Sequence, residues 1–128
     1  MKRLLTTLAL LSVLLTACSA PLGGNTLKPG ETLTTSQGIT ITFVEVIEDS
    51  RCPADAMCVW QGNVKVRIEV GFGTEVQQYV LTLGELLEGD ANAVDISGHI
   101  ISLLDVQPYP LASQPASFDD YEITLGIN

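Results

Sequence analysis

Basic residues are scarce in this chain. Its 128 residues include 6 lysines and arginines against 15 aspartates and glutamates, which gives a formal net charge of −9. A surface of that sign repels phosphate backbones and anionic lipid headgroups wherever salt does not screen it. We therefore expect no nucleic-acid partner, and we do not expect charge to hold the chain on a membrane.

Residues with catalytic or metal-binding chemistry are also few. Histidine occurs once, as His99, with no serine or cysteine nucleophile arranged around it, which favours a surface or strand-end histidine over a general base. Acidic residues at 45–55, 90–95 and 119–120 could supply oxygens for Ca²⁺, but none has the spacing of a known loop, so solvated acidic turns are preferred. We expect no enzyme activity, no catalytic residue, no cofactor and no metal site.

No apolar run is long enough to span a bilayer as a helix, which takes roughly 20 residues. The chain begins instead with Lys2 and Arg3, followed by an apolar stretch over residues 4–15, which is the pattern of an export signal. Residues 15–18 (Leu-Thr-Ala-Cys) resemble the lipobox of bacterial lipoproteins. That resemblance implies cleavage before Cys18 and a lipid on its sulfur, with palmitate among the expected acyl chains. An ordinary signal peptide with a chance cysteine is the alternative.

The expected location is the bacterial cell envelope, where the lipid on Cys18 would anchor the exported protein, because two or more acyl chains hold stably where one is marginal. Ser19 resembles the outer-membrane sorting signal, which implies the outer membrane in a host with two membranes. Residues 1–17 are the predicted signal peptide, residues 18–29 the lipidated cysteine and a flexible tether, and residues 30–128 a single domain. Removal of the signal leaves 4 basic against 15 acidic residues, a formal charge of −11.

The two remaining cysteines, Cys52 and Cys58, predict a disulfide. An even pair in a small exported domain favours one, and a ring of about seven residues stabilises by roughly 2–2.5 kcal/mol in the chain-entropy account. A metal site and a redox pair are the alternatives. Two cysteines make only half of a structural zinc site, and the spacing is not Cys-x-x-Cys, so the disulfide is preferred.

Apolar residues recur with period two through most of the remaining chain. The alternating runs cover residues 39–46, 64–70, 79–83, 100–106 and 121–127. Alternation of this length is typical of strands with one buried and one wet face, and residues 71–74 should close a hairpin. Only residues 83–93 could carry a helical turn, and Pro108 should stop the strand before it. We predict an all-β fold, an antiparallel β-sandwich or small barrel of about six to seven strands.

Residues 49–62 (DSRCPADAMCVWQG) form the most unusual stretch, because they hold both remaining cysteines and the only tryptophan, Trp60. Their Asp-Ser-Arg-Cys-Pro…Cys-x-Trp-x-Gly pattern is similar to that of a largely uncharacterised family of small bacterial secreted proteins and lipoproteins. The resemblance covers residues 30–127 and includes Pro-Tyr-Pro at 108–110 and Asp-Tyr at 120–121. Family members often have alanine at the position of Gln61. The resemblance implies the fold and the disulfide, but no activity.

Two interpretations of this loop remain open. In the preferred one the loop plugs one end of the sandwich, Trp60 is buried, and Asp49 accepts backbone N–H bonds that shape the turn. In the other, the stiff loop is presented for recognition, with Asp49, Arg51 and Trp60 as candidate binding residues. Tyr121, near the start of the last run, is similar to the tyrosine corner of sandwich domains, which is a structural role.

Three hypotheses for function follow from these observations. The leading one is a lipid-anchored, non-enzymatic envelope module, binding or structural, that presents the disulfide-closed loop to a protein or polymer of the envelope. The second is an inhibitor of an exogenous hydrolase such as a lysozyme or a protease, because an acidic surface suits a cationic enzyme. The third is a Ca²⁺-dependent glycan binder or enzyme, which no spacing of acidic residues supports.

Overall fold

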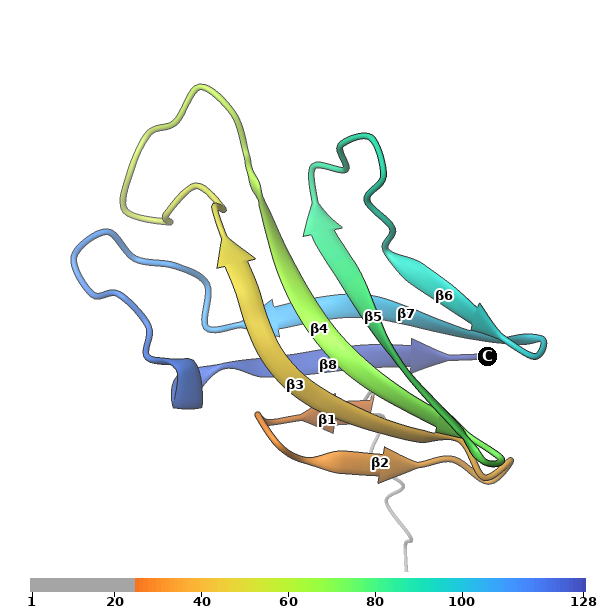
Figure 1. Ribbon diagram of the computed structural model, residues 1–128. Coiled ribbons are helices and arrows are strands. Elements are labelled where there is room, and N and C mark those ends of the chain that lie inside the picture. Colours follow the sequence, from red (N-terminus) through yellow and green to blue (C-terminus); the bar gives the residue numbers. More distant parts are fainter. Residues whose placement is uncertain (1–24) are drawn as a thin grey trace, which may run out of the picture.

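The computed structural model describes residues 25–128, and these fold as a β-sandwich of two four-stranded antiparallel sheets packed against each other (Figure 1). The strands are β1 (Asn25–Leu27), β2 (Thr32–Thr34), β3 (Thr40–Asp49), β4 (Asn63–Phe72), β5 (Glu75–Gly84), β6 (Ala93–Ile96), β7 (His99–Gln107) and β8 (Glu122–Ile127). One short 3₁₀ turn, η1 (Phe118–Asp120), precedes β8. The predicted all-β sandwich is confirmed.

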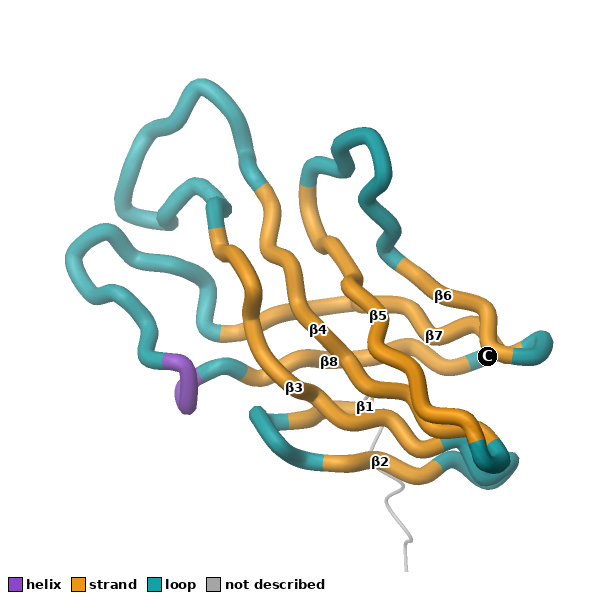
Figure 2. The backbone as a smooth tube through the Cα atoms, viewed as in Figure 1, coloured by secondary structure: helices purple, strands orange, loops and turns teal. Residues whose placement is uncertain are grey.

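One sheet has the order β1-β8-β7-β6 and the other the order β2-β3-β4-β5 (Figure 2). The predicted hairpin joins β4 and β5, with Phe72 opposite Glu75 across a two-residue turn. Gly73, the first residue of that turn, has a φ of 62°, which glycine adopts at no steric cost. Proline at 108 follows the last residue of β7, as predicted.

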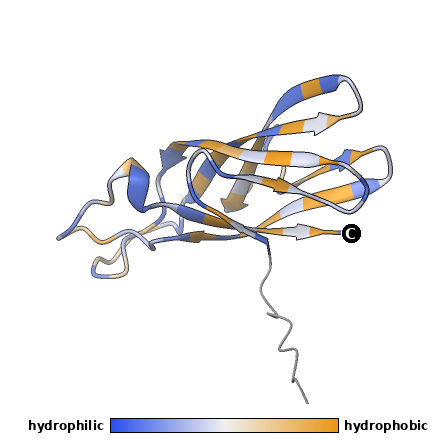
Figure 3. Ribbon diagram, turned by 90° about the horizontal axis from the view of Figure 1, so that it is seen from below, coloured by the Kyte–Doolittle hydropathy of each residue, from blue (hydrophilic) through white to orange (hydrophobic). Residues whose placement is uncertain are grey.

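The core lies between the two sheets and takes alternate residues from each strand. Apolar and polar residues alternate along the strands in Figure 3. The largest fully buried side chains are Phe43, Ile39, Ile41, Ile68, Leu81, Ile101, Leu103, Ile123, Leu125, Val64, Val66 and Val106. Complete burial of one such side chain contributes about 1.5–3 kcal/mol, so period-two burial is the main source of stability.

The predicted tether is too long at its C-terminal end. Residues Asn25–Leu27 form β1, which pairs with β8, so the fold includes residues that the prediction placed in the tether. The reason is that Leu27 is buried in the core and that β1 covers the edge of β8. The predicted signal peptide, Cys18 and the first part of the tether lie outside the described residues. Within residues 25–128, no helix has the length and apolarity needed to cross a membrane.

The segment expected to carry a helical turn, residues 83–93, contains no helix. It crosses from one sheet to the other instead, and Asn92 ties the two together. The Asn92 Nδ2 donates to the carbonyl oxygens of Thr82 in β5 at 3.1 Å and of Leu103 in β7 at 2.9 Å. These two bonds use both hydrogens of the Asn92 amide and hold the crossing between β5 and β7.

The sandwich has two distinct ends. The loops β3–β4, β5–β6 and β7–β8 leave one of them, which we call the loop end. The other, the hairpin end, holds the β4–β5 and β6–β7 hairpins and the C-terminus (Figure 1). Asn25 belongs to the hairpin end, because it lines one hollow together with Ser36, His99 and Asn128. The ten residues of β3 rise about 30 Å, which sets the separation of the two ends.

Candidate functional site

The disulfide loop, residues 50–62, joins β3 to β4 at the loop end. Cys52 and Cys58 are bonded, with Cα atoms 5.9 Å apart, which confirms the predicted disulfide. The strand ladder continues into the base of the loop, since the Cys52 N–H donates to the Gln61 carbonyl at 2.8 Å. Gly62 has a φ of 70°, and a Cβ there would lie 1.9 Å from the Ser50 carbonyl oxygen. The base of the loop is therefore narrow and requires glycine.

Asp49 and Arg51 form a buried ion pair under this loop. The Arg51 side chain is 5% exposed and that of Asp49 8% exposed. Two parallel hydrogen bonds join them: Arg51 Nε donates to Asp49 Oδ1 at 2.8 Å, and Arg51 Nη2 donates to Asp49 Oδ2 at 2.7 Å. Asp49 ends β3 and also accepts the Arg51 backbone N–H at 3.3 Å. This bidentate geometry fixes both side chains as well as the turn between them.

The ion pair also joins the two sheets. Arg51 donates to the carbonyl oxygens of Val106 in β7 at 2.7 Å and of Pro108, just after β7, at 3.0 Å. Its guanidinium lies 4.9 Å from the centre of the Tyr109 ring, and the Tyr121 hydroxyl donates to Asp49 Oδ2 at 3.1 Å. Tyr121 thus has the predicted structural role, but it bonds a carboxylate and not the backbone.

The charges in this network shift two pKa values. Burial acts to raise the pKa of Asp49, but the hydrogen bonds and positive charge of Arg51 outweigh it, so the pKa lies below its ordinary value. Burial and the neighbouring carboxylate raise the pKa of Tyr121. Asp49 is therefore a carboxylate and Tyr121 a neutral phenol at neutral pH, as the donor and acceptor roles require.

The disulfide loop is also docked on the β7–β8 loop, which lies beside it in Figure 1. The Ala54 N–H donates to the Pro110 carbonyl at 3.0 Å. In return, Asp55 accepts the backbone N–H groups of Ala112 at 2.6 Å and Ser113 at 3.1 Å. These bonds, led by the one from Ala112, lower the pKa of Asp55. The disulfide, the buried ion pair and this docking together leave the loop few alternative conformations.

Trp60 is not buried. It is 67% exposed, and Met57 and Val59 on the same loop are more exposed still. The preferred interpretation of a plug with a buried tryptophan is therefore wrong for Trp60. The candidate binding residues divide: Asp49 and Arg51 support the loop from below, and Trp60 faces solvent.

A shallow hollow of about 350 Å³ lies beside Trp60. Its lining includes Leu87 from the β5–β6 loop and the carboxylates Glu48 and Glu85. Lys65 also lines it, but its ammonium is bound to Asp90 at 2.7 Å, which raises the pKa of Lys65 and lowers that of Asp90. In the part of the chain that the structure describes, Glu48 and Glu85 form no ion pair. The hollow therefore combines an aromatic side chain with more negative than positive charge.

Asn63 completes this hollow from the base of β4. It is almost fully buried, and its Nδ2 donates to the Glu85 carbonyl at 2.8 Å. Its Oδ1 has no hydrogen-bond partner among residues 25–128. The Asn63 amide oxygen and the two glutamates thus add acceptor atoms to the lining of the hollow.

Sequence reasoning did not single out Met57, Val59 and Leu87. A signal existed for Met57, because it lies inside the ring closed by Cys52 and Cys58, which is too short to bury an apolar side chain. No such signal marked Leu87, which comes next to Trp60 only through the fold.

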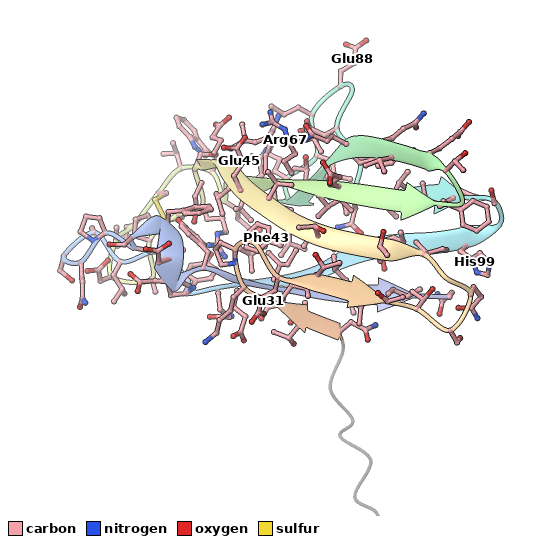
Figure 4. The ribbon with its side chains drawn as sticks, turned by 60° about the horizontal axis from the view of Figure 1, so that its bottom comes forward. Glu31, Phe43, Glu45, Arg67, Glu88 and His99 are labelled. Carbon is pink, nitrogen blue, oxygen red and sulfur yellow. A yellow bond between two sulfur atoms is a disulfide. The ribbon has the colours of Figure 1, made fainter. Side chains whose placement is uncertain are left out.

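His99 starts β7 at the hairpin end, which makes it the strand-end histidine that was predicted. Figure 4 shows it far from the disulfide, and it takes no part in the loop end. Among residues 25–128, no three His, Cys, Asp or Glu side chains come together as metal ligands would.

No family model, curated protein or solved structure matches this chain.

Proposed function

We propose that this protein is a lipid-anchored, non-enzymatic binding module of the bacterial cell envelope that engages a basic protein or polymer with its loop end. One observation carries the proposal. Met57, Val59 and Trp60 are exposed on a loop that a disulfide and a buried ion pair hold in place. Apolar side chains on a rigid loop lose little entropy on binding, and tryptophan is among the residues that dominate binding energies at interfaces.

The chemistry of the hollow beside Trp60 supports a basic partner. A lysine or arginine side chain placed there would meet Trp60, whose ring can attract a cation, together with Glu48 and Glu85. Lys65 would not oppose it, because Asp90 compensates its charge. Without Lys2 and Arg3 the chain has 4 basic and 15 acidic residues, and this charge of −11 draws a cation toward the domain and speeds encounter at low salt.

The position of the loop end supports presentation away from the membrane. An anchor on Cys18 precedes Asn25, and Asn25 is at the hairpin end. The loop end lies about 30 Å away along the strands. A partner bound by Trp60 would therefore sit on the far side of the domain from the anchoring point.

The anchor is tested by mass spectrometry of the protein recovered from bacterial membranes. We expect a mature chain that begins at Cys18 and carries the mass of acyl chains on that residue. In the matched Cys18→Ser variant the lipidated product should be absent. A mature chain cut elsewhere, or an unmodified Cys18, would remove the anchoring half of the proposal.

Binding is tested with residues 19–128, which contain every core residue from Leu27 to Leu125. This domain is crosslinked in native envelopes and its partners are recovered. The test variant changes Met57, Val59 and Trp60 together to serine, and the control changes Leu104, an exposed leucine on the other sheet, to serine. We expect a partner that the control retains and the test variant loses. Equal capture by both would reject the loop end as the binding surface.

The charge of the partner is tested by replacing Glu48 and Glu85 with glutamine. These changes remove negative charge without changing the size of either side chain. We expect weaker capture of the partner and a smaller loss of binding when salt is added, because salt screens the interactions that the changes remove. Unchanged capture would exclude a basic ligand in this hollow and leave the apolar contacts of Trp60 as the basis of binding.

Inhibition of a cationic hydrolase is the second candidate function, and the acidic hollow beside a protruding, stiff loop favours it. The loop would enter the active-site cleft, and the carboxylates would pair with basic residues at its rim. Residues 19–128 should then slow a cationic lysozyme or a protease at micromolar concentration. No inhibition across a panel of such enzymes would dismiss this candidate without affecting the first one.

A further inference from the structure

Three of the four edge strands of the sandwich are short, and the fourth is long. β1 and β2 have three residues each and β6 has four, whereas β5 has ten. β5 pairs only with β4, and their ladder runs without the register shifts of the β3–β4 and β7–β8 ladders. Proteins usually protect a sheet edge by shortness, by a bulge, or with proline or lysine. β5 contains none of these protections.

The direction of the free backbone groups follows from Thr82. Its N–H donates to the Ala91 carbonyl at 2.8 Å and its carbonyl accepts from Asn92, so both point away from β4. Because direction alternates along a strand, the N–H and C=O groups of Val76, Gln78 and Val80 point the same way. None of these groups has a hydrogen-bond partner in residues 25–128. They form an open edge able to accept another strand.

The side chains along this edge identify its occupant. Residues 76–80 (VQQYV) carry no charge, although the whole chain has a net charge of −9. Val76 is 63% exposed and Val80 43% exposed. A second copy of the chain is repelled by most of this acidic surface but meets no like charge here. We propose that β5 pairs antiparallel with β5 of a second copy, which joins two four-stranded sheets into one.

The register of this pairing is fixed by the residues available. A two-fold axis through Gln78 places Val76 of each copy opposite Val80 of the other and Gln78 opposite itself. All three outward-facing residues are then paired, and each pair exchanges two hydrogen bonds. A shift by two residues would bring in Thr82, whose groups are already bonded, or Thr74 in the hairpin turn. Such an interface is isologous and closed, so it gives dimers and not fibres.

The register provides a sharp test by sedimentation of residues 19–128 over a roughly hundredfold range of protein concentration. The wild-type chain should pass from monomer to dimer on the order of micromolar concentration, as expected for a small interface. The variant with Val76→Lys and Val80→Lys places like charges opposite each other and should stay monomeric. The variant with Val76→Lys and Val80→Glu places opposite charges together and should dimerise again.

The matched control replaces Ile100 and Leu104, exposed on the outer face of β7, with lysine. It adds the same charge elsewhere and should dimerise like the wild type. Circular dichroism and thermal unfolding show which variants are folded. A wild-type chain that is monomeric at every concentration, or a folded lysine–glutamate variant that does not dimerise, would overturn the proposal. If the control also fails to dimerise, the loss of the dimer in the Val76→Lys, Val80→Lys variant results from net charge and not from a change in β5.

Discussion

Replacing Arg51 with methionine should be among the most damaging single changes in this domain. Methionine keeps an apolar stem but removes the guanidinium, so the buried Asp49 carboxylate loses the donors at 2.8 and 2.7 Å. The carbonyls of Val106 and Pro108 lose theirs at 2.7 and 3.0 Å. Removal of one partner from a buried ion pair costs about 3–5 kcal/mol. A domain of this size is stable by about 5–15 kcal/mol, so the loss is a large share of the whole.

The same substitution at an exposed ion pair is the matched control. Arg67 pairs with Glu45 on the outer face of its sheet, where Figure 4 labels both residues, and their side chains are 34% and 43% exposed. Arg67→Met should cost less than about 1 kcal/mol, because solvent screens such a pair. The unfolding free energies of both variants are measured by urea unfolding of residues 19–128, monitored by circular dichroism. Equal costs for the two variants would refute the reasoning that burial makes the difference.

The pH dependence of the Arg51→Met variant identifies why it loses stability. The pKa of Asp49 is lowered in the folded protein, so its ion pair stabilises the fold above the unfolded pKa of about 3.9 and ceases to do so as the pH falls through the lower folded value. The difference in unfolding free energy between wild type and Arg51→Met should therefore narrow as the pH is lowered below about 4. A constant difference across that range would assign the loss to packing instead of charge.

Three further changes have expected results. Replacing Cys52 and Cys58 together with alanine should lower the unfolding free energy by about 2 kcal/mol, as measured by urea unfolding, and a change near zero would contradict the chain-entropy estimate for this ring. Gly62→Ala should destabilise more than Gly73→Ala in the same assay, because both have positive φ but only the first would place a Cβ against a carbonyl oxygen. Trp60→Ser should change stability by less than about 0.5 kcal/mol, and a larger loss would mean that Trp60 packs on the domain.

The long strands could be predicted from the sequence, and the short ones could not. Val64, Val66, Ile68 and Val70 alternate with charged residues, and all four are buried in β4 as the pattern indicates. β1, β2 and β6 have three or four residues each, too few to display a period. Their strand structure comes from the edges that they cover, which only the assembled sheets provide.

In the disulfide loop, the disulfide could be predicted from the sequence, but the exposure of Trp60 and the burial of Arg51 could not. The disulfide followed from two cysteines in a chain of this class, a local feature. The burial of Arg51 depends on carbonyls at Val106 and Pro108, which are more than fifty residues away in sequence. No pattern within residues 49–62 indicates those partners. A lone tryptophan in a small domain is usually buried, whereas Trp60 is exposed here, and nothing in its local sequence indicates this.

The start of the domain also determines how it would bear tension. β1 begins at the hairpin end and runs beside β8 toward the loop end, with three residue pairs between them. A pull between an anchor before Asn25 and a partner held at Trp60 acts along the strands and not across them. The hydrogen bonds of β1 and β8 would then carry the load side by side and yield together, whereas a pull across the strands would open them one after another. A three-residue strand placed this way resists detachment better than its length suggests.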